Sequence, residues 1–311
     1  MKITLQPSGH AFEVAPKQTI LNAALAAGFS LPYSCRTGCC STCKARVVDG
    51  SIDQGLVLEK HLSRDERDRG YALLCSAYAA SDCTIEIHEL EGLAAVQPKL
   101  YPARIAKLER IDDVTLLQLR MPLNENMHFI AGQYVDLLVN NVRRSYSIAN
   151  PPDPNGLPFV ELHVRHYEQG AASHHLHTIA KERDMVKLEG PYGTFFLRES
   201  TKPVILLASG TGFAPIKAIV EHALRTKSTR DFTLYWGGKV YRRDLVETWP
   251  IKAHFPDGFP HLAVLKDHPD LSNHQVYACG APAMVDAARA DFIAHGLPAD
   301  EFFADAFIAK E

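Results

Sequence analysis

Alternation of hydrophobic and polar residues opens the chain. It runs through residues 3–5, stops at a Ser-Gly turn and resumes at residues 12–14, a pattern that predicts a β-hairpin. Apolar residues at helical spacing follow over residues 19–27, and Gly28 is placed to end a short helix there. Alternation returns at residues 84–87. Strands around a short helix predict an α+β domain for this part of the chain.

A linker is predicted between Glu91 and Pro102, where periodic signals are few and two prolines occur. We therefore place a first domain at residues 1–92 and a second at residues 101–199. In the second domain, Pro, Gly and Asn turns separate short strand patterns, which is the spacing of a small antiparallel β-barrel. The strand patterns lie at residues 114–119, 133–139 and 160–164.

The pattern changes again near residue 200. Residues 204–208 form a continuous apolar run, which a glycine turn and a helix with apolar residues at helical spacing follow. A second strand, turn and helix run through residues 276–292, with Pro282 placed to begin the helix. Buried strands that alternate with helices predict an α/β domain with a parallel sheet over residues 200–311.

Composition limits the possible partners. Hydrophobic residues make up 46% of the 311 residues and charged residues 22%, which is ordinary for a globular protein of two or three domains. The formal net charge of −3 does not favour binding to nucleic acid or to an anionic membrane surface. No stretch approaches the roughly 18 uninterrupted apolar residues of a membrane-spanning helix, and no apolar leader opens the chain. The expected location is the cytoplasm.

The cysteines provide the first chemical signal. There are seven, an odd number, and four of them lie within residues 35–43, which is a poor arrangement for a disulfide framework. Cys35, Cys40 and Cys43 stand as C-x4-C-x2-C, and Cys75 follows downstream. This is the plant-type spacing for a [2Fe-2S] cluster, in which four thiolates surround two irons and backbone N–H groups tune the potential.

A structural zinc site is the alternative for the same cysteines. The spacing disfavours zinc, because Cys40 and Cys43 have no second C-x2-C partner and C-x4-C-x2-C is not a usual zinc pattern. Cys39 lies between two ligand positions, and using it would break the cluster spacing, so we expect it to be a buried neighbour. Cys83 is expected to pack beside the closing strand as a small hydrophobic residue.

A second motif, R-x-Y-S at residues 144–147, follows Ala-Gly-Gln-Tyr at residues 131–134. Together with the cysteines it resembles the ferredoxin–NADP reductase-like iron-sulfur flavoproteins that have an N-terminal plant-type ferredoxin domain, over essentially the whole chain. The resemblance implies a ferredoxin (β-grasp) domain, an FAD-binding antiparallel barrel and an NAD(P)H-binding domain. It also implies that Arg144 neutralises the flavin pyrophosphate, that Tyr146 packs against the isoalloxazine ring and that the Ser147 hydroxyl approaches flavin N5.

Further flavin contacts are implied by the same resemblance. Gly170, Ala172 and Ser173 resemble a second pyrophosphate segment, in which a glycine turn and the N–H groups of a helix start face the anion. His163 and Val164 are implied as flavin contacts as well. A metal site is the alternative for the histidines here, but they lack the acidic or cysteine ligands of a metal pattern, and we expect exposed residues flanking the flavin. These histidines are His163, His166, His174, His175 and His177.

Nucleotide contacts are implied at the start of two helices. Gly210, Thr211, Gly212 and Pro215 follow a buried strand and open a helix, so the backbone can approach a nicotinamide dinucleotide and the helix terminus favours its pyrophosphate. A glycine turn at such a place is also common as a purely structural feature. The resemblance adds Cys279 and Gly280 beside the nicotinamide and flavin, and Asp305 and Phe307 near the flavin. The implied catalytic residues are Tyr146, Ser147, Cys279 and Phe307.

The resemblance implies an NAD(P)H-dependent electron-transfer reductase. NADH or NADPH gives a hydride to FAD, and single electrons leave through the [2Fe-2S] cluster, whose plant-type potential of about −400 mV makes it a strong donor. The implied partner is a protein electron acceptor, an oxygenase component or a sugar-nucleotide dehydratase, expected to dock at residues 38–42. Reductases that serve sugar-nucleotide dehydratases are the most similar members, and aromatic-ring oxygenase reductases share most of the match. The long matches lie at residues 143–150, 188–191 and 276–280.

Two other functions remain open at this point. One keeps the fold but makes the chain a stand-alone flavin or ferric reductase with a small-molecule acceptor. The other is a non-enzymatic ferredoxin-like carrier whose C-terminal half only docks. The chain also departs from the family between Gly238 and Tyr277, a segment shorter by about one strand and its loop, where ribose and 2′-phosphate contacts usually arise. Arg242 and Arg243 could accept a 2′-phosphate, although a basic pair on a loop is more often solvated.

Overall fold

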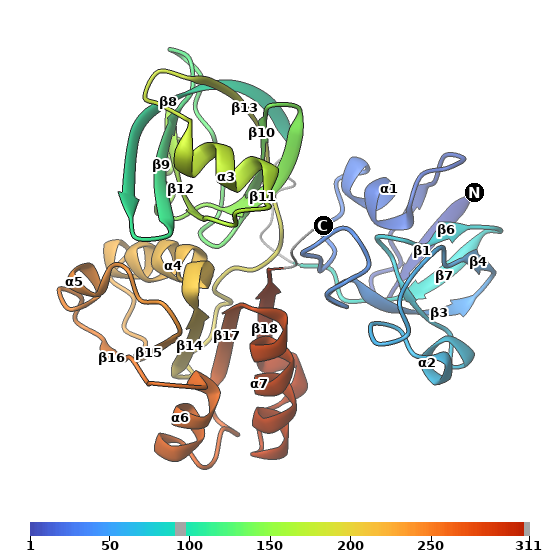
Figure 1. Cartoon of the computed structure of the whole chain (residues 1–311). Helices are drawn as coiled ribbons and strands as arrows, with labels where there is room; N and C mark the ends of the chain where they lie inside the picture. Colours follow the sequence, from blue (N-terminus) through green and yellow to red (C-terminus); the bar gives the residue numbers. More distant parts are fainter. Residues whose placement is uncertain (91–97, 308–311) are drawn as a thin grey trace. The chain divides into compact units, whose positions relative to one another are not determined.

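The chain folds into two compact units in the computed structural model, which describes residues 1–90 and 98–307 (Figure 1). The first unit is Met1–Gln97 and the second is Pro98–Glu311. The multidomain organisation predicted from the sequence is confirmed at this level. The finer boundaries at residues 92, 101, 199 and 200 stay a prediction.

The first unit contains the predicted hairpin and short helix. Strand β1 (Lys2–Gln6) pairs antiparallel with β2 (Ala11–Glu13), and α1 (Ile20–Ala26) follows. The Thr19 side chain caps this helix by accepting a hydrogen bond from the Asn22 N–H, which satisfies a donor that the helix leaves open. The predicted closing strand is β7 (Cys83–Glu86), which lies parallel to β1.

A five-stranded sheet forms the frame of the first unit, in the order β2-β1-β7-β3-β5. It adds β3 (Lys44–Asp49) and β5 (Tyr71–Leu73). A small second sheet pairs β4 (Ile52–Asp53) with β6 (Tyr78–Ala79), and a capping box that joins Ser63 and Glu66 begins α2 (Arg64–Asp68). The strand order places the long loop between α1 and β3 next to the segment that follows β5.

The second unit begins with a six-stranded antiparallel sheet in the order β11-β10-β13-β8-β9-β12. Its two outer strands meet through a bridge between Ile148 and Leu162, so the sheet curls around one hydrophobic core. The predicted strands at 114–119, 133–139 and 160–164 are all present, with ends displaced by one residue. The six strands are β8 (Lys99–Ile111), β9 (Val114–Arg120), β10 (Tyr134–Val139), β11 (Val142–Ser147), β12 (Phe159–Arg165) and β13 (Met185–Tyr192).

The predicted linker was partly wrong. Residues 91–97 lie outside the described residues, but residues 99–102 belong to strand β8, where Pro102 pairs with Lys187 of β13. Strand β8 pairs with its other neighbour, β9, only from Arg104 onward. Pro102 therefore has a partner strand on one side only, a position where the missing N–H of a proline is tolerated.

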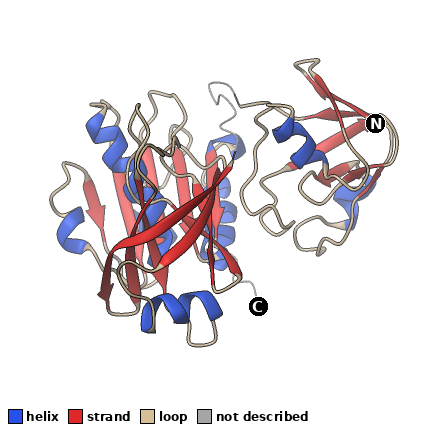
Figure 2. Cartoon of the chain, turned by 90° about the horizontal axis from the view of Figure 1, so that it is seen from above, coloured by secondary structure: helices blue, strands red, loops and turns tan. Residues whose placement is uncertain are grey.

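A five-stranded parallel sheet completes the second unit, in the order β16-β15-β14-β17-β18. Successive residues of the central strand face opposite layers. Leu206 and Ala208 pack with α4 on one face, whereas Ile205 and Leu207 pack with α6 and α7 on the other. Figure 2 shows the helices of the chain in blue and the strands of its sheets in red. The strands are β14 (Val204–Ser209), β15 (Phe232–Gly237), β16 (Lys252–His254), β17 (Gln275–Gly280) and β18 (Phe302–Ala306). The helices around this sheet are α4 (Phe213–Arg225), α5 (Arg243–Val246), α6 (Pro260–Asp267) and α7 (Pro282–Ala294). Helix α3 (Ala171–Thr178) packs on the antiparallel sheet instead.

The two sheets of the second unit share a hydrophobic core. Val114, Ala131 and Phe195 from the antiparallel part are buried together with Ile216 and Ile219 of α4. Burial of apolar surface between the two sheets is what makes residues 98–307 one compact unit. Among the described helices, none is long and apolar enough to cross a lipid bilayer.

Gly132 offers a test of this packing. Its φ is +101°, and an added Cβ would overlap the carbonyl oxygen of Phe195. We expect Gly132→Ala to destabilise the second unit by about 1–3 kcal/mol through backbone strain and about 1–3 kcal/mol more through overpacking. Urea unfolding followed by tryptophan fluorescence reports on this unit, because Trp236 and Trp249 both lie in it.

The matched control is Gly258→Ala. Gly258 also has a positive φ, +120°, but an added Cβ would meet nothing within 4 Å. It should show the strain cost alone, about 1–3 kcal/mol. Equal losses of stability in the two variants would contradict the packing argument for Gly132.

Candidate functional site

Four cysteine side chains gather in the first unit, although Cys75 is distant from the others in the sequence. Hydrogen bonds connect the thiol of Cys35 with those of Cys40 and Cys75, and the thiol of Cys43 with that of Cys75. These are the four residues that the plant-type spacing predicts as ligands. The structure brings them together, and their role as ligands stays a prediction.

Backbone N–H groups of the cysteine loop point at the sulfurs. The N–H groups of Thr37 and Cys39 donate to Cys35 Sγ, each at 3.4 Å. The Gly38 N–H donates to Cys75 Sγ at 3.2 Å, and the Cys35 N–H donates to Cys40 Sγ at 3.5 Å. Such donors stabilise negative charge on sulfur and raise the reduction potential of a bound cluster.

The chemistry of the four thiols fits an iron-sulfur cluster. Hydrogen bonds from Cys40 and Cys75 lower the pKa of Cys35, whereas the hydrogen bond with Cys35, and then burial, raise the pKa of Cys40. The pKa of Cys75 is raised too, first by its hydrogen bonds with Cys35 and Cys43. Four thiols this close cannot all ionise unless positive charge is added between them. Two bound irons would supply that charge.

The zinc alternative stays disfavoured by the spacing of the four cysteines. Cys40 and Cys43 form one C-x2-C pair, whereas zinc ribbons use two such pairs.

The two neighbouring cysteines differ from expectation. Cys39 was predicted to be buried, but it is half-exposed, and its thiol donates to the Thr37 carbonyl at 3.3 Å. It turns outward because the loop directs its backbone N–H, not its sulfur, at the cluster position. Cys83 is buried as predicted, but it is the first residue of the closing strand β7, and its thiol also donates to the Ser51 carbonyl at 3.2 Å.

The flavin motif lies on β11, where successive side chains point to opposite faces of the strand. Arg143 and Ser145 contact Asp136 of the neighbouring strand, at 3.2 and 2.7 Å. Arg144 and Tyr146 lie on the opposite face of the strand. Burial raises the pKa of Tyr146 to about 12, so its phenol stays neutral, and Ser147 is buried at the end of the strand. The arginine, tyrosine and serine of the motif are thus held by pairing with β10.

A helix start stands at the predicted pyrophosphate segment. Gly170 is the N-cap residue of α3, and no side chain caps the N–H groups of its first turn. Ala172 is buried, and the Ser173 hydroxyl donates within the turn to the Gly170 carbonyl at 3.2 Å. Backbone N–H groups, and not the Ser173 side chain, are therefore the donors available to a phosphate here.

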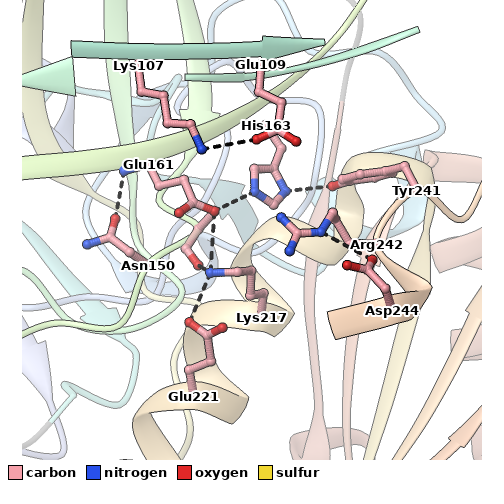
Figure 3. A network of polar contacts seen from close by, with 11 residues as sticks. Lys107, Glu109, Asn150, Glu161, His163, Lys217, Glu221, Tyr241, Arg242 and Asp244 are labelled. Carbon is pink, nitrogen blue, oxygen red and sulfur yellow. Dashed lines mark hydrogen bonds and ion pairs between the residues drawn. The ribbon is translucent and has the colours of Figure 1, made fainter. Parts of the chain in front are cut away.

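The histidine predictions were partly wrong. His163 was expected to be exposed, but it is only 4% exposed, and both ring nitrogens are engaged, by Tyr241 OH at 2.7 Å and Glu161 at 2.8 Å (Figure 3). Val164 is fully buried in the core of the antiparallel sheet. Their side chains face inward because β12 is buried on both faces here, so a flavin could meet these two residues only through their backbone atoms.

The other histidines lie near the surface around α3. His166 stacks on His177 with ring centroids 4.4 Å apart, and it lies 3.2 Å from His174 between ring nitrogens. His175 contacts Asn140 at 2.9 Å. These rings thus contact one another and Asn140.

The two predicted nucleotide segments touch each other. Strand β14 ends at Ser209, a 3-10 turn covers Gly210–Gly212, and α4 follows with Pro215 buried in its first turn. A Cβ on Gly212 would overlap the Cys279 carbonyl, so only glycine permits this approach. The Ser209 hydroxyl accepts a hydrogen bond from the Ala281 N–H at 2.9 Å, which joins the turn to the segment after β17.

Residues of β17 lie next to the turn at Gly210–Gly212, and residues of the C-terminal strand β18 lie next to β17. Cys279 is fully buried, and burial raises the pKa of its thiol well above the ordinary value. It pairs in register with Asp305 of β18, and the Phe307 N–H donates to the Gly280 carbonyl at 2.8 Å. Phe307 lies just beyond β18 and is half-buried. The structure therefore brings Gly212, Cys279, Asp305 and Phe307 to one edge of the parallel sheet.

The short segment before β17 still supplies an edge strand. Residues 239–274 contain α5, β16 and α6, and β16 completes a five-stranded sheet. Arg242 lies 3.4 Å from Asp244, and Arg243 lies 2.8 Å from Glu247 and covers the Phe255 ring. Both arginines considered for a 2′-phosphate thus have acidic neighbours on their own segment.

Sequence reasoning missed a buried polar cluster in the second unit. Glu161 and Tyr241 contact His163, and Lys217, which is 6% exposed, pairs with Glu161 and Glu221 (Figure 3). One signal was available. Lys217 stands within the apolar run Phe-Ala-Pro-Ile-Lys-Ala-Ile-Val, where a lysine interrupts the buried face of a helix.

Comparison with domain families matches both units. Residues 3–80 match the 2Fe-2S iron-sulfur cluster binding domain. Residues 103–197 match the oxidoreductase FAD-binding domain. The first match contains all four predicted cluster cysteines, and the second contains the R-x-Y-S motif.

Relatives match the chain over its full length. The CDP-6-deoxy-L-threo-D-glycero-4-hexulose-3-dehydrase reductase of Yersinia pestis is 39% identical over 331 residues, covering 100% of this chain and 99% of that protein. Reductase component 1 of terephthalate 1,2-dioxygenase from Comamonas sp is 34% identical and covers 98% and 97%. Among solved structures, the Amycolatopsis cytochrome P450 reductase GcoB has a TM-score of 0.80 at 30% identity, with 98% of each chain covered.

The cluster ligands can be tested with two serine substitutions. Cys75→Ser should lose the visible absorption of the cluster, because a hydroxyl replaces one of four thiolates, while nucleotides should still bleach the flavin. Cys39→Ser is the matched control and should keep a normal spectrum, since its thiol turns to the Thr37 carbonyl. Absorption spectra and iron content measure both. A normal [2Fe-2S] spectrum in Cys75→Ser would remove Cys75 from the ligand set.

Proposed function

Because this chain belongs to the ferredoxin–NADP reductase-like iron-sulfur flavoproteins, we propose that it serves a sugar-nucleotide dehydratase as its source of single electrons. The family passes electrons from NAD(P)H through FAD and a [2Fe-2S] cluster to a partner protein. The choice of partner rests on the 39% identity with the dehydrase reductase over the whole chain. An oxygenase is the second candidate, supported by the terephthalate dioxygenase reductase component at 34%.

The flavin would be held by the antiparallel sheet, which we assign as the FAD-binding barrel. Bound FAD accepts a pair of electrons with a hydride and releases them one at a time. Arg144 would neutralise the pyrophosphate together with the N–H groups at the start of α3. Tyr146, held neutral by burial, would pack against the isoalloxazine, and Ser147 would place its hydroxyl at the reacting edge.

The nicotinamide nucleotide would lie at the edge of the parallel sheet, which we assign as the NAD(P)H-binding domain. The turn at Gly210–Gly212 follows the carboxyl end of β14, where ligands of parallel α/β sheets bind. Cys279 and Phe307 would border the reacting rings. Because the pKa of Cys279 is raised by burial, its thiol stays protonated and acts as a neutral packing group, not as a nucleophile.

One structural observation carries the electron-transfer part of the proposal. The structure brings together four sulfurs from two distant parts of the first unit and turns four backbone N–H groups toward them. A cluster of this kind exchanges single electrons, which is the chemistry that a partner protein in a radical or oxygenase reaction requires.

Anaerobic titration tests the proposal directly. NADH or NADPH should bleach the flavin and then the cluster of the purified holoprotein, and addition of a CDP-sugar dehydratase with its substrate should restore the oxidised spectrum. Terephthalate-type oxygenase and ferric citrate serve as alternative acceptors. Faster reoxidation by ferric citrate would favour the stand-alone ferric reductase. Protein that holds a cluster but takes up no flavin would be a ferredoxin-like carrier.

The acceptor would dock beside the cysteine loop. The Ser41 hydroxyl donates to the His61 carbonyl at 2.9 Å, and the His61 N–H donates to Leu58. Leu58 is 62% exposed, and Leu56 on the same segment is fully exposed. Exposed leucines next to the exit for electrons provide apolar contact area for a protein partner.

We therefore expect the double variant Leu56→Ser/Leu58→Ser to reduce its protein acceptor about tenfold more slowly, the cost of losing one or two good apolar contacts. Ferricyanide, which needs no docking surface, should be reduced at the rate of the unmodified protein. Leu123→Ser is the matched control, because Leu123 is 86% exposed in the second unit. Stopped-flow measurement gives the rate of reduction of each acceptor. An equal loss of rate with ferricyanide would contradict a docking role for the two leucines.

A further inference from the structure

A buried lysine connects two parts of the second unit. Lys217 lies on α4 with its side chain 8% exposed, and its Nζ donates to the Ala149 carbonyl at 3.1 Å. The ammonium also lies 2.9 Å from Glu221 on the same helix and 3.4 Å from Glu161 on β12 (Figure 3). Burying an ammonium is costly even when it is paired, so its position calls for an explanation beyond packing.

Protonation in the surrounding network follows from its partners. Burial alone would raise the pKa of Glu161, but the hydrogen bond from His163 and the charge of Lys217 outweigh burial and bring it to about 2. Glu161 is therefore ionised and can only accept. Burial lowers the pKa of His163, so its imidazole is neutral and donates from Nε2 to Glu161. His163 Nδ1 then accepts from the Tyr241 hydroxyl.

The hydrogen bonds thus run from Tyr241 through His163 to the Glu161 carboxylate, which also pairs with the Lys217 ammonium. Glu161 is anchored further by its own N–H, which donates to the Asn150 side chain at 2.7 Å. No member can turn without breaking a hydrogen bond in a buried place, and the bonds to Glu161 involve its charged carboxylate. A network of this kind holds its elements at one distance.

The elements that Lys217 joins are those of the two cofactor sites. Ala149 follows Ser147, the last residue of the flavin motif, by two positions. Helix α4 begins directly after the turn at Gly210–Gly212 and carries Lys217 in its second turn. The Lys217 to Ala149 bond therefore fixes the end of the flavin strand against the helix that presents the nucleotide turn.

We propose that Lys217 is a positioning residue that sets the flavin strand at the correct distance from the nucleotide turn. This inference rests on the proposed function. Glu161 and Glu221 hold the ammonium in place, and the Ala149 carbonyl receives it. A purely structural ion pair would contribute to stability alone. A positioning residue governs hydride transfer, because a displacement of about 1 Å in a reacting pair slows a reaction roughly 100-fold.

The test uses Lys217→Met in the holoprotein, a change that removes the ammonium but keeps an unbranched side chain. Flavin bleaching by NADH or NADPH, followed in anaerobic stopped flow, should slow by about 10–100-fold. Flavin content and the nucleotide Kd, measured by fluorescence of Trp236 and Trp249, should remain within about threefold, because the binding segments themselves are intact. An unchanged bleaching rate overturns the proposal.

A matched control comes from the other end of β14. Lys202→Met removes a lysine that pairs with Glu301 at 2.6 Å, before the strand begins and away from the nucleotide turn. It should lose stability but keep the bleaching rate. Loss of rate in both variants to the same extent would overturn the proposal, since the effect would then follow stability.

A second variant covers the case in which Lys217→Met does not fold because Glu161 is left as an unpaired buried charge. Lys217→Met/Glu161→Gln removes the ammonium and one of the two carboxylates that the lysine pairs with, and should recover the fold. The proposal requires that bleaching stay slow in this double variant. Recovery of both fold and rate would show that charge compensation alone matters, and would overturn it.

Amide hydrogen exchange gives a measurement that does not depend on turnover. Peptides that cover residues 148–150 should exchange faster in Lys217→Met than in the unmodified protein, whereas peptides of β13 should not change. Unchanged exchange at residues 148–150 would show that the Lys217 to Ala149 hydrogen bond does not hold this segment, and would overturn the proposal. If NADH and NADPH both fail to bleach the unmodified protein, the proposed function fails, and the exchange measurement still decides whether Lys217 holds the strand.

Discussion

The shared core of the second unit is the constraint on which the function depends. Val114, Ala131 and Phe195 of the antiparallel part are buried against Ile216 and Ile219 of α4, so the two sheets cannot separate without exposing apolar surface to water. Hydride transfer requires a donor and an acceptor in van der Waals contact. Two cofactor sites on separate, loosely joined domains would seldom meet this requirement. The shared core would keep the two proposed cofactor sites at a constant separation.

Within that frame, polar contacts provide what apolar contacts cannot. Hydrophobic packing has no preferred direction and tolerates small sliding movements, whereas a buried charged hydrogen bond is lost when its atoms separate by an ångström. The network from Tyr241 to Lys217 crosses the same boundary as the core. The core therefore holds the sheets together, and the network selects one arrangement among those that the core permits.

The first unit solves a different problem, the accumulation of four ionisable thiols in a small space. Backbone N–H groups of Thr37, Gly38 and Cys39 reach the sulfurs because the loop is short and contains small residues. The same loop leaves Cys39 turned outward. Three of the four predicted ligands lie on this loop, and Leu56 and Leu58, which we propose as a docking surface, are exposed.

Spacing and periodicity were enough to establish much of this protein. The C-x4-C-x2-C motif, the strand patterns and the glycine turn before α4 are local features, which depend on residues close together in the sequence. Long-range partners are not. The burial of His163 between Glu161 and Tyr241, the strand pairing of Pro102 and the contact of Lys217 with Ala149 all depend on segments far apart in the chain. Only the packed structure decides them, because the cost of burying a charge or losing an N–H depends on which neighbour the fold supplies.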